Sequence, residues 1–271
     1  MPHHSAFESP IATIWRPWKT NSSPCALEIF AECGRHTQHR RRVGIRAYAC
    51  DTCLNPGDDV LQPDVEYRIL EMIFAGKVLF VWLGMPCTSF SVSRKGDGLG
   101  PGPLRSNEQP MGLGGLNKRD QQKVLIGILL LFFSARVIWA CLQCRIPFAL
   151  ENPLSSRCWL TPTLVLIKDY CVCQFIHLDL CQFGESWKKP TGILHAFVNL
   201  QEVAVTCQGT HRLCSRTGKK HIPLQCLSAD HRFMTLVAQP YPLQMPKKLS
   251  ESLGKQLFPE RSAVRGERFN F

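Results

Sequence analysis

The sequence lacks the apolar segment that directs proteins to secretion. Its first thirty residues contain no continuous hydrophobic core, and polar residues and tryptophans there are interspersed with Pro2, Pro10, Pro17 and Pro24. Because a secretory signal peptide requires a hydrophobic core of about 7–15 residues, we expect an intracellular protein. The nucleus is one of the compartments that agree with this expectation.

An uninterrupted hydrophobic run long enough to cross a membrane is also missing. The longest apolar stretch, residues 124–142, contains Ser134 and Arg136 and follows the charged segment NKRDQQK. A membrane-spanning helix needs about 20 predominantly apolar residues. The interrupted stretch therefore predicts a helix in the core of a soluble protein that does not bind membranes.

Cysteine and positive charge, by contrast, are abundant. The 271 residues include 14 cysteines, which we expect to be reduced thiols packed as small hydrophobic side chains. A hydrophobic content of 45% is enough for one large domain, or for one domain with an appendage. The formal net charge of +11 favours a polyanionic partner, although a merely basic soluble protein would carry the same charge.

Segments with strand-like and helix-like patterns alternate along the chain. Strands are predicted at residues 26–30, 45–50, 77–83, 146–150, 174–180 and 191–198. Helices are predicted at residues 38–44, 64–76 and 118–144, the first with Arg40, Arg41 and Arg42 on its polar face. This alternation predicts an α/β fold with a mostly parallel sheet and helices on both faces. Sheets of this kind bind ligands beyond the carboxyl ends of their strands.

Four polar turns fall at the carboxyl ends of predicted strands, and they should therefore line one crevice. The turns lie at residues 30–34, 51, 86–87 and 151–153. Their most distinctive sequences are PCTSFS, which begins at Pro86, and ALENP, which contains Glu151. Since Cys87 lies just outside a buried run and behind a proline, a substrate can reach it more readily than it could reach a core cysteine.

The order of these turns resembles the cytosine-5 nucleic-acid methyltransferases, over roughly residues 26–198. In that family a Phe-x-Gly-x-Gly turn begins the cofactor site and an acidic residue ends the second strand. A Pro-Cys followed by Phe-Ser carries the nucleophile, and a Glu-Asn-Val or Glu-Asn-Pro follows a later strand. The resemblance implies a Rossmann-like methyltransferase fold that uses S-adenosyl-L-methionine to methylate carbon 5 of cytosine, in DNA rather than in RNA.

The resemblance also implies a role for each catalytic residue. Cys87 would attack carbon 6 of the ring as a thiolate with a lowered pKa, on a turn that Pro86 fixes. Glu151 would hydrogen-bond nitrogen 3 and the exocyclic amine, and Asn152 would hold the turn. Lys189, in CQFGESWKKPTGIL, would supply positive charge beside the base. The simpler alternatives are an ordinary Pro-Cys turn and a glutamate near a helix N-terminus.

The cofactor-binding residues that the resemblance implies are Phe30, Gly34, Asp51, Asp59 and Val60. Asp51 would accept hydrogen bonds from the ribose hydroxyls, and Asp59 would meet the adenine amine; the alternative for both is a solvated loop aspartate. Glu32 stands where the family has the first glycine of the turn. A carboxylate there would face the methionine end of the cofactor, where the backbone normally approaches closely.

The loop between Ser91 and Lys118 is rich in glycine and proline, and we expect it to be mobile. Its basic residues, Arg94, Lys95 and Arg105, are predicted to meet phosphates while the loop closes over an extruded base. The alternative is a flexible loop with scattered charges.

The domain organisation expected is an N-terminal extension (1–25), a catalytic domain (26–198), a small region that is a reduced recognition element (199–245) and a basic tail (246–271). The third of these contains Cys207, His211, Cys214 and His221, whose spacing would allow a zinc site. Because that spacing is irregular for a zinc finger, we expect a reduced hairpin with two incidental histidines and no metal.

Two other functions agree with the same sequence. An RNA cytosine methyltransferase of the same build would carry these motifs in the same order. A catalytically silent nucleic-acid-binding module derived from such an enzyme would explain Glu32 and the missing recognition region. The sequence identifies no protein partner.

Overall fold

The computed structural model describes residues 23–96, 100–169, 172–224 and 232–259. Most of the expected N-terminal extension, and the last part of the expected basic tail, lie outside the described residues. The strands are β1 (Cys25–Ile29), β2 (Ala47–Cys50), β3 (Val78–Leu83), β4 (Phe148–Pro153), β5 (Gln174–Asp179) and β6 (Pro190–Ala196). The longer helices are α2 (Arg35–Arg42), α3 (Pro63–Phe74), α4 (Lys118–Cys144), α5 (Pro162–Asp169) and α7 (Gln244–Leu257). Short helical turns are η1 (Arg157–Leu160), η2 (Leu180–Phe183), η3 (Gln201–Val203) and α6 (Met234–Val237).

The strands form one mixed six-stranded sheet in the order β2-β1-β3-β4-β6-β5. β1 pairs in parallel with β2 and β3, and β3 with β4, whereas β6 runs antiparallel to both β4 and β5. The prediction of an α/β fold is confirmed. The prediction that Glu151 to Pro153 form a turn is wrong, because these residues continue β4 and pair with β6.

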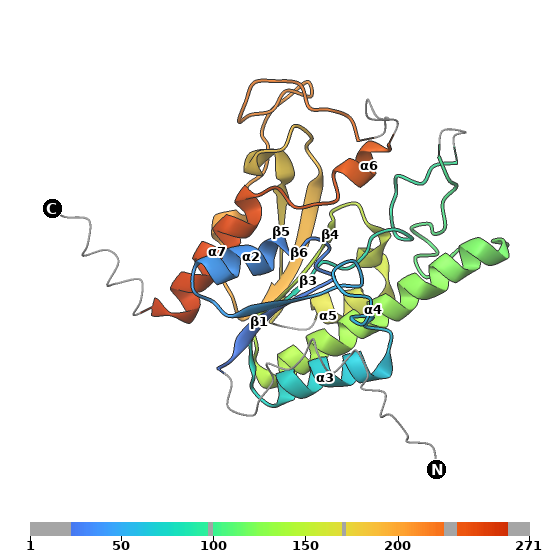
Figure 1. The fold of residues 1–271 in the computed structure, drawn as a ribbon. Helices are drawn as coiled ribbons and strands as arrows, with labels where there is room; N and C mark the ends of the chain where they lie inside the picture. Colours follow the sequence, from blue (N-terminus) through green and yellow to red (C-terminus); the bar gives the residue numbers. More distant parts are fainter. Residues whose placement is uncertain (1–22, 97–99, 170–171, 225–231, 260–271) are drawn as a thin grey trace, which may run out of the picture.

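Helices cover both faces of the sheet, with α3, α4 and α5 on one side and α2 and α7 on the other (Figure 1). The period-two alternation of β1 divides its side chains between these layers. Leu27 and Ile29 pack into the core that includes α3 and α4 residues, and Ala26 packs into the core that includes Met245 and Leu249 of α7. Burial of apolar side chains on both faces explains why the central strands are almost continuously hydrophobic.

The helix α4 has the bounds that its sequence predicts. Asn117 caps its first turn by accepting a hydrogen bond from the Asp120 N–H at 2.9 Å, and Arg145 ends it in a left-handed conformation with φ of 54°. Among the described helices, α4 has the length and composition of a membrane span, yet 56% of its most apolar window is buried inside the protein. It packs as a core helix over the sheet.

Two arginines that the sequence places at the surface are buried. Arg40 is fully buried in α2 with its guanidinium 4.8 Å from the centre of the Phe80 ring. Arg105 stacks at 3.8 Å over Phe90 and donates to the Ser89 hydroxyl at 3.0 Å. The prediction that Arg105 meets phosphates is therefore wrong, because its guanidinium fastens the loop after Cys87 to the protein's own core.

The predicted boundary at residue 198 and the predicted tail from residue 246 are both wrong for the described residues. Leu200, Met245 and Leu253 pack in the same core as the sheet residues Phe80 and Trp82. Helix α7 lies along α2 in Figure 1, and its apolar side chains pack in this same core. The segment after residue 198 therefore belongs to the same domain as the sheet and covers one of its faces.

Candidate functional site

A cavity of about 560 Å³ opens at the carboxyl edge of the sheet. Its walls come from the segments that follow β1, β2 and β3 and from the end of β4. The chain reverses direction across the sheet between β1 and β3, since β2 lies on one side of β1 and β3 on the other. Open α/β sheets form their ligand crevices at such a reversal, because loops on its two sides diverge.

The cavity brings together most of the residues singled out in the sequence. The residues lining it include Phe30, Asp51, Asp59, Val60, Pro86, Cys87, Glu151 and Lys189. Gly34 and Asn152 do not line it. Gly34 begins α2 with φ of 67°, and the Asn152 amide donates to the Met85 carbonyl at 2.7 Å. Asn152 thus holds the turn that carries Cys87 from behind.

Cys87 is half-buried at the start of the turn after β3. Burial raises the pKa of its thiol, and the negative charge of Glu151 raises it further, while the positive charge of Lys189 acts in the opposite direction. The expectation of a lowered pKa is therefore wrong for the Cys87 thiol in this structure. The thiol is protonated at neutral pH, so a bound positive charge or a base is needed to ionise it.

Glu151 is buried beside this turn, and its carboxylate accepts a hydrogen bond of 2.6 Å from the Tyr241 hydroxyl. Burial raises the pKa of the Glu151 carboxyl, against the opposing effects of Lys189 and of the Tyr241 hydrogen bond. A carboxyl with a raised pKa retains its proton more readily and can donate it to a ring nitrogen.

Tyr241 is the site residue that sequence reasoning missed. Its ring packs edge-on against Trp82, with centroids 5.8 Å apart, and against His36 at 4.8 Å. A side chain at Gly84 would bring its Cβ within 2.8 Å of the Tyr241 hydroxyl, so glycine leaves the space that this ring occupies. Tyr241 follows no predicted strand, and no signal in the sequence relates it to Glu151.

Lys189 lies at the entrance of β6 with a positive φ of 30°. Its ammonium donates to the Ala238 carbonyl at 2.9 Å, which ties the segment carrying Tyr241 to the cavity wall. The ammonium also favours the charged forms of both Cys87 and Glu151. A backbone conformation of this kind costs about 1–3 kcal/mol, which the contacts around Lys189 have to offset.

The turn after β1 has a left-handed backbone at Phe30, Glu32 and Gly34, with φ of 60°, 51° and 67°. The Glu32 N–H donates to the Asp51 carboxylate at 2.8 Å, and the Cys53 N–H donates to the other oxygen at 2.8 Å. Asp51 therefore joins the two turns with a fixed orientation. A carboxylate can still accept further hydrogen bonds with its remaining lone pairs.

Asp59 and Val60 lie on the wall beside the Asp51 turn. Asp59 accepts a hydrogen bond from the Leu61 N–H at 3.0 Å, and Val60 is buried. Glu32 also faces the cavity, and burial raises the pKa of its carboxyl while Lys189 and Arg35 lower it. This side of the cavity combines the apolar surface of Val60 with the carboxylates of Asp51 and Asp59, which suits a ligand with an apolar part and hydrogen-bond donors.

A second group of potential ligand residues lies outside the cavity. The side chains of Cys207, Cys214 and His221 come together as the spacing allows, but His211 is exposed and points its ring toward Thr210. Cys181, which the sequence did not single out, is the fourth member of the group. The expectation of a hairpin with two incidental histidines is wrong for His221.

Comparison with known proteins does not assign this chain to a family. No protein-family model matches it, and no curated protein is significantly similar to it. Its function is therefore argued from the arrangement of its own residues around the cavity, and above all from Cys87, Glu151, Lys189 and Tyr241.

Proposed function

We propose that the protein transfers a methyl group from S-adenosyl-L-methionine to carbon 5 of cytosine in DNA through a covalent adduct of Cys87. The observation that carries the proposal is that Cys87 and Glu151, from segments more than sixty residues apart, line one cavity together with Lys189. If the Cys87 and Glu151 motifs had only separate structural roles, they would not be expected to line the same cavity. The α/β fold with a crevice at its strand ends is consistent with a Rossmann-like methyltransferase.

The chemistry needs a sulfur nucleophile and a proton donor on one pyrimidine. Attack of the Cys87 thiolate forms a sulfur–carbon bond at carbon 6 and breaks the double bond between carbons 5 and 6, so that electron density moves onto the ring. A proton held by Glu151 at ring nitrogen 3 neutralises the charge that develops there. Carbon 5 would then bond to the methyl group, whose bond to the sulfonium sulfur would break and leave a neutral thioether. Water would take the proton from carbon 5, the sulfur–carbon bond at carbon 6 would break, and Glu151 would recover the proton from nitrogen 3, which restores the double bond and the Cys87 thiolate.

The residues around the cavity suit the proposed cofactor. Phe30 and Val60 offer apolar surface, and Asp51 is fixed by two backbone N–H groups with lone pairs to spare for ribose hydroxyls. Glu32 departs from this pattern, because its side chain stands in the turn after β1, where the backbone would approach the cofactor closely. When bound, the cofactor supplies an electrophilic methyl group, and its positive charge would favour the Cys87 thiolate.

A base paired within a duplex cannot reach this cavity. Glu151 is only 6% exposed, and Cys87 lies beside it in the half-buried turn. An enzyme that modifies such a base has to extrude it from the stack or to act on single strands, at a cost of a few kcal/mol. The formal charge of +11 agrees with a polyanionic substrate that is held by its phosphates.

Covalent trapping tests the proposal directly. The full chain is incubated with S-adenosyl-L-methionine and with a duplex DNA that contains 5-fluorocytosine, whose fluorine cannot leave as a proton does. We expect an adduct that survives denaturing electrophoresis. Cys87→Ala should abolish the adduct while cofactor binding, measured by calorimetry, stays nearly unchanged. Cys144→Ser, a control at the end of α4, should trap as the parent does.

The remaining outcomes separate the alternatives. Trapping by a 5-fluorocytosine RNA but not by DNA would make the protein an RNA methyltransferase. No adduct, together with no cofactor binding at millimolar concentration, would make it a silent binding module. An adduct that persists in Cys87→Ala would place the nucleophile elsewhere and overturn the mechanism.

A further inference from the structure

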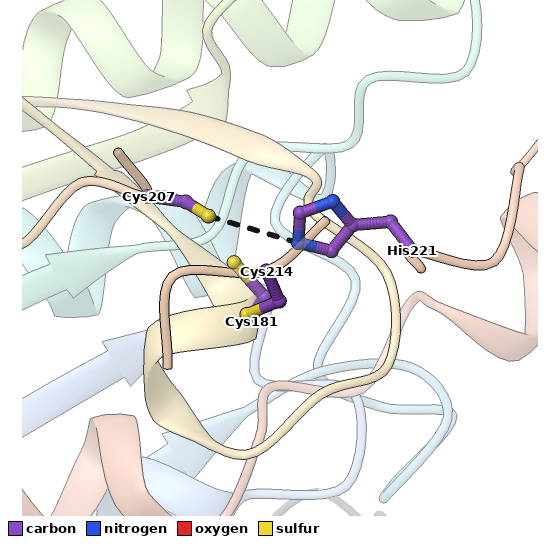
Figure 2. Close-up of side chains that lie close together, drawn as sticks. All are labelled: Cys181, Cys207, Cys214 and His221. Carbon is purple, nitrogen blue, oxygen red and sulfur yellow. Dashed lines mark hydrogen bonds between the residues drawn. The ribbon is translucent and has the colours of Figure 1, made fainter. Parts of the chain in front are cut away.

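Four side chains outside the cavity converge on one point, as Figure 2 shows. They are Cys181, Cys207, Cys214 and His221, and their sulfur and nitrogen atoms all lie within 4.8 Å of one another. Cys181 comes from η2, directly after β5, and the other three come from the loop segment that follows η3, residues 204–222 (here called the 204–222 lobe). The group thus joins the lobe to the sheet.

The spacing of these atoms agrees with a tetrahedral zinc site. Zinc–sulfur bonds of about 2.3 Å in a tetrahedron place the sulfur atoms about 3.8 Å apart. The Cys207 sulfur lies 3.7 Å from the nearest ring nitrogen of His221. Three cysteines with one histidine are a common donor set of closed structural zinc sites, and the three thiols are not joined in disulfides.

Hydrogen bonds around the sulfurs favour thiolate ligands. The Ser215 N–H donates to the Cys207 sulfur at 3.3 Å, and the Gln182 amide donates to the Cys181 sulfur at 3.4 Å. Donors of this kind orient metal ligands and are usual around zinc–thiolate centres.

The 204–222 lobe has no apolar core that could hold it together. Among the described residues, the buried cluster in this region consists of the three cysteines alone. The larger apolar side chains of the lobe, Leu213 and Ile222, are 39% and 42% exposed. A segment of this size needs a metal or a disulfide in place of a core.

We propose that these four side chains bind one structural zinc ion that fastens the 204–222 lobe to the edge of the sheet. The thiols release their protons to the solvent when the metal binds. The site is closed, since all four ligands come from the protein. Its role is structural, and none of its four ligands lines the cavity of the proposed methyl transfer.

The position of the lobe shows what the zinc ion stabilises. The Cys207 N–H donates to the Asp179 carboxylate at 2.7 Å, and Lys188 lies 3.6 Å from the same carboxylate. The Ile222 N–H donates to the Ser186 carbonyl at 2.9 Å. These contacts hold the segment that leads into Lys189, so loss of the metal should loosen one wall of the cavity.

Metal analysis of the full chain, purified without added metal and desalted, tests the proposal. We expect about one zinc per chain, released in step with the reaction of about three thiols with an organomercurial reagent. Cobalt substituted for zinc should give the intense visible absorption of a tetrahedral cobalt–thiolate centre. Less than about one tenth of a zinc per chain, an iron chromophore, or a disulfide among the three cysteines would overturn the proposal.

Variants identify the ligands. Cys214→Ser should lower the zinc content several-fold, whereas Cys173→Ser, a half-buried cysteine outside the site, should leave it unchanged. Because Cys214→Ser could fail to fold, His221→Cys provides a second measurement. It retains four donors, so it should keep the metal, and the sulfur-to-cobalt absorption should increase. Full zinc content in Cys214→Ser, or an unchanged cobalt spectrum in His221→Cys, would show that these residues are not ligands.

Discussion

The hydrogen bond between Tyr241 and Glu151 gives the most direct test of the site's energetics. Tyr241→Phe removes one oxygen atom and preserves the ring contacts with Trp82 and His36. It leaves the buried Glu151 carboxylate without the donor that lies 2.6 Å away. Since a hydrogen bond to a charged group contributes about 1.5–3 kcal/mol, we expect the free energy of unfolding at neutral pH to fall by about that amount.

The destabilisation caused by Tyr241→Phe should depend on pH, and the shift in the pKa of Glu151 determines its direction. Burial raises that pKa above its ordinary value of 4.5, and the Tyr241 hydrogen bond opposes the rise, so Tyr241→Phe raises it further. A raised carboxyl pKa means stability that is present below about pH 4.5 and lost as the pH rises through the folded-state pKa. Between about pH 4.5 and pH 7.5, the free energy of unfolding therefore falls more in the variant than in the parent. At about pH 4.5 only a neutral hydrogen bond, about 0.5–1.5 kcal/mol, separates them.

Guanidinium unfolding followed by tryptophan fluorescence measures the difference in free energy of unfolding between the variant and the parent at each of the two pH values. The melting temperature at neutral pH should fall by about 3–12 °C. Tyr67→Phe is the matched control, because Tyr67 is 67% exposed on α3 and should change stability by less than about 0.5 kcal/mol. A Tyr241→Phe variant as stable as the parent, or destabilised equally at both pH values, would refute this reasoning.

Two further predictions concern cofactor and nucleic-acid binding. Glu32→Gly relieves a left-handed backbone with φ of 51° and should raise the free energy of unfolding by about 1 kcal/mol. It should also tighten S-adenosyl-L-methionine binding by calorimetry, and unchanged affinity would mean that Glu32 does not oppose the cofactor. Lys219→Glu with Lys220→Glu, on the exposed surface of the 204–222 lobe, should reduce the slope of log K against log salt for DNA by about 1–2. Lys77→Glu, just before β3 at the end of the sheet away from the cavity, should leave that slope unchanged. Equal slopes in all variants would exclude the lobe from phosphate contact.

Local patterns determined the six strands and the helices α2, α3 and α4, but they predicted no helix for the residues of α5 and α7. The β-branched and aromatic run before Gly84 forms β3, and the apolar periodicity after Asn117 forms α4 with the expected bounds. These elements follow from the sequence because each depends on neighbours within a few residues. The strand ends also predicted the cavity residues that follow β1, β2 and β3, because parallel strands bring their carboxyl ends to one edge of the sheet.

Long-range packing decided what the local patterns could not. Arg40 and Arg105 are charged residues of a type usually found at the surface, yet each stacks on a buried phenylalanine ring. Tyr241 reaches Glu151 from ninety residues away, and the burial of Cys87 reverses the expected direction of its pKa shift. None of these contacts produces a pattern in the neighbouring sequence from which it could be predicted.

By itself, the sequence determined most of the alternating strands and helices, and it singled out Cys87 just after a strand and Glu151 close to the end of another. Only the tertiary structure decided that these two side chains share a cavity with Tyr241 and that Cys181 joins Cys207, Cys214 and His221. The physical reason is that periodicity reports the burial of a segment against its surroundings, whereas pKa shifts and metal sites depend on which distant groups those surroundings contain.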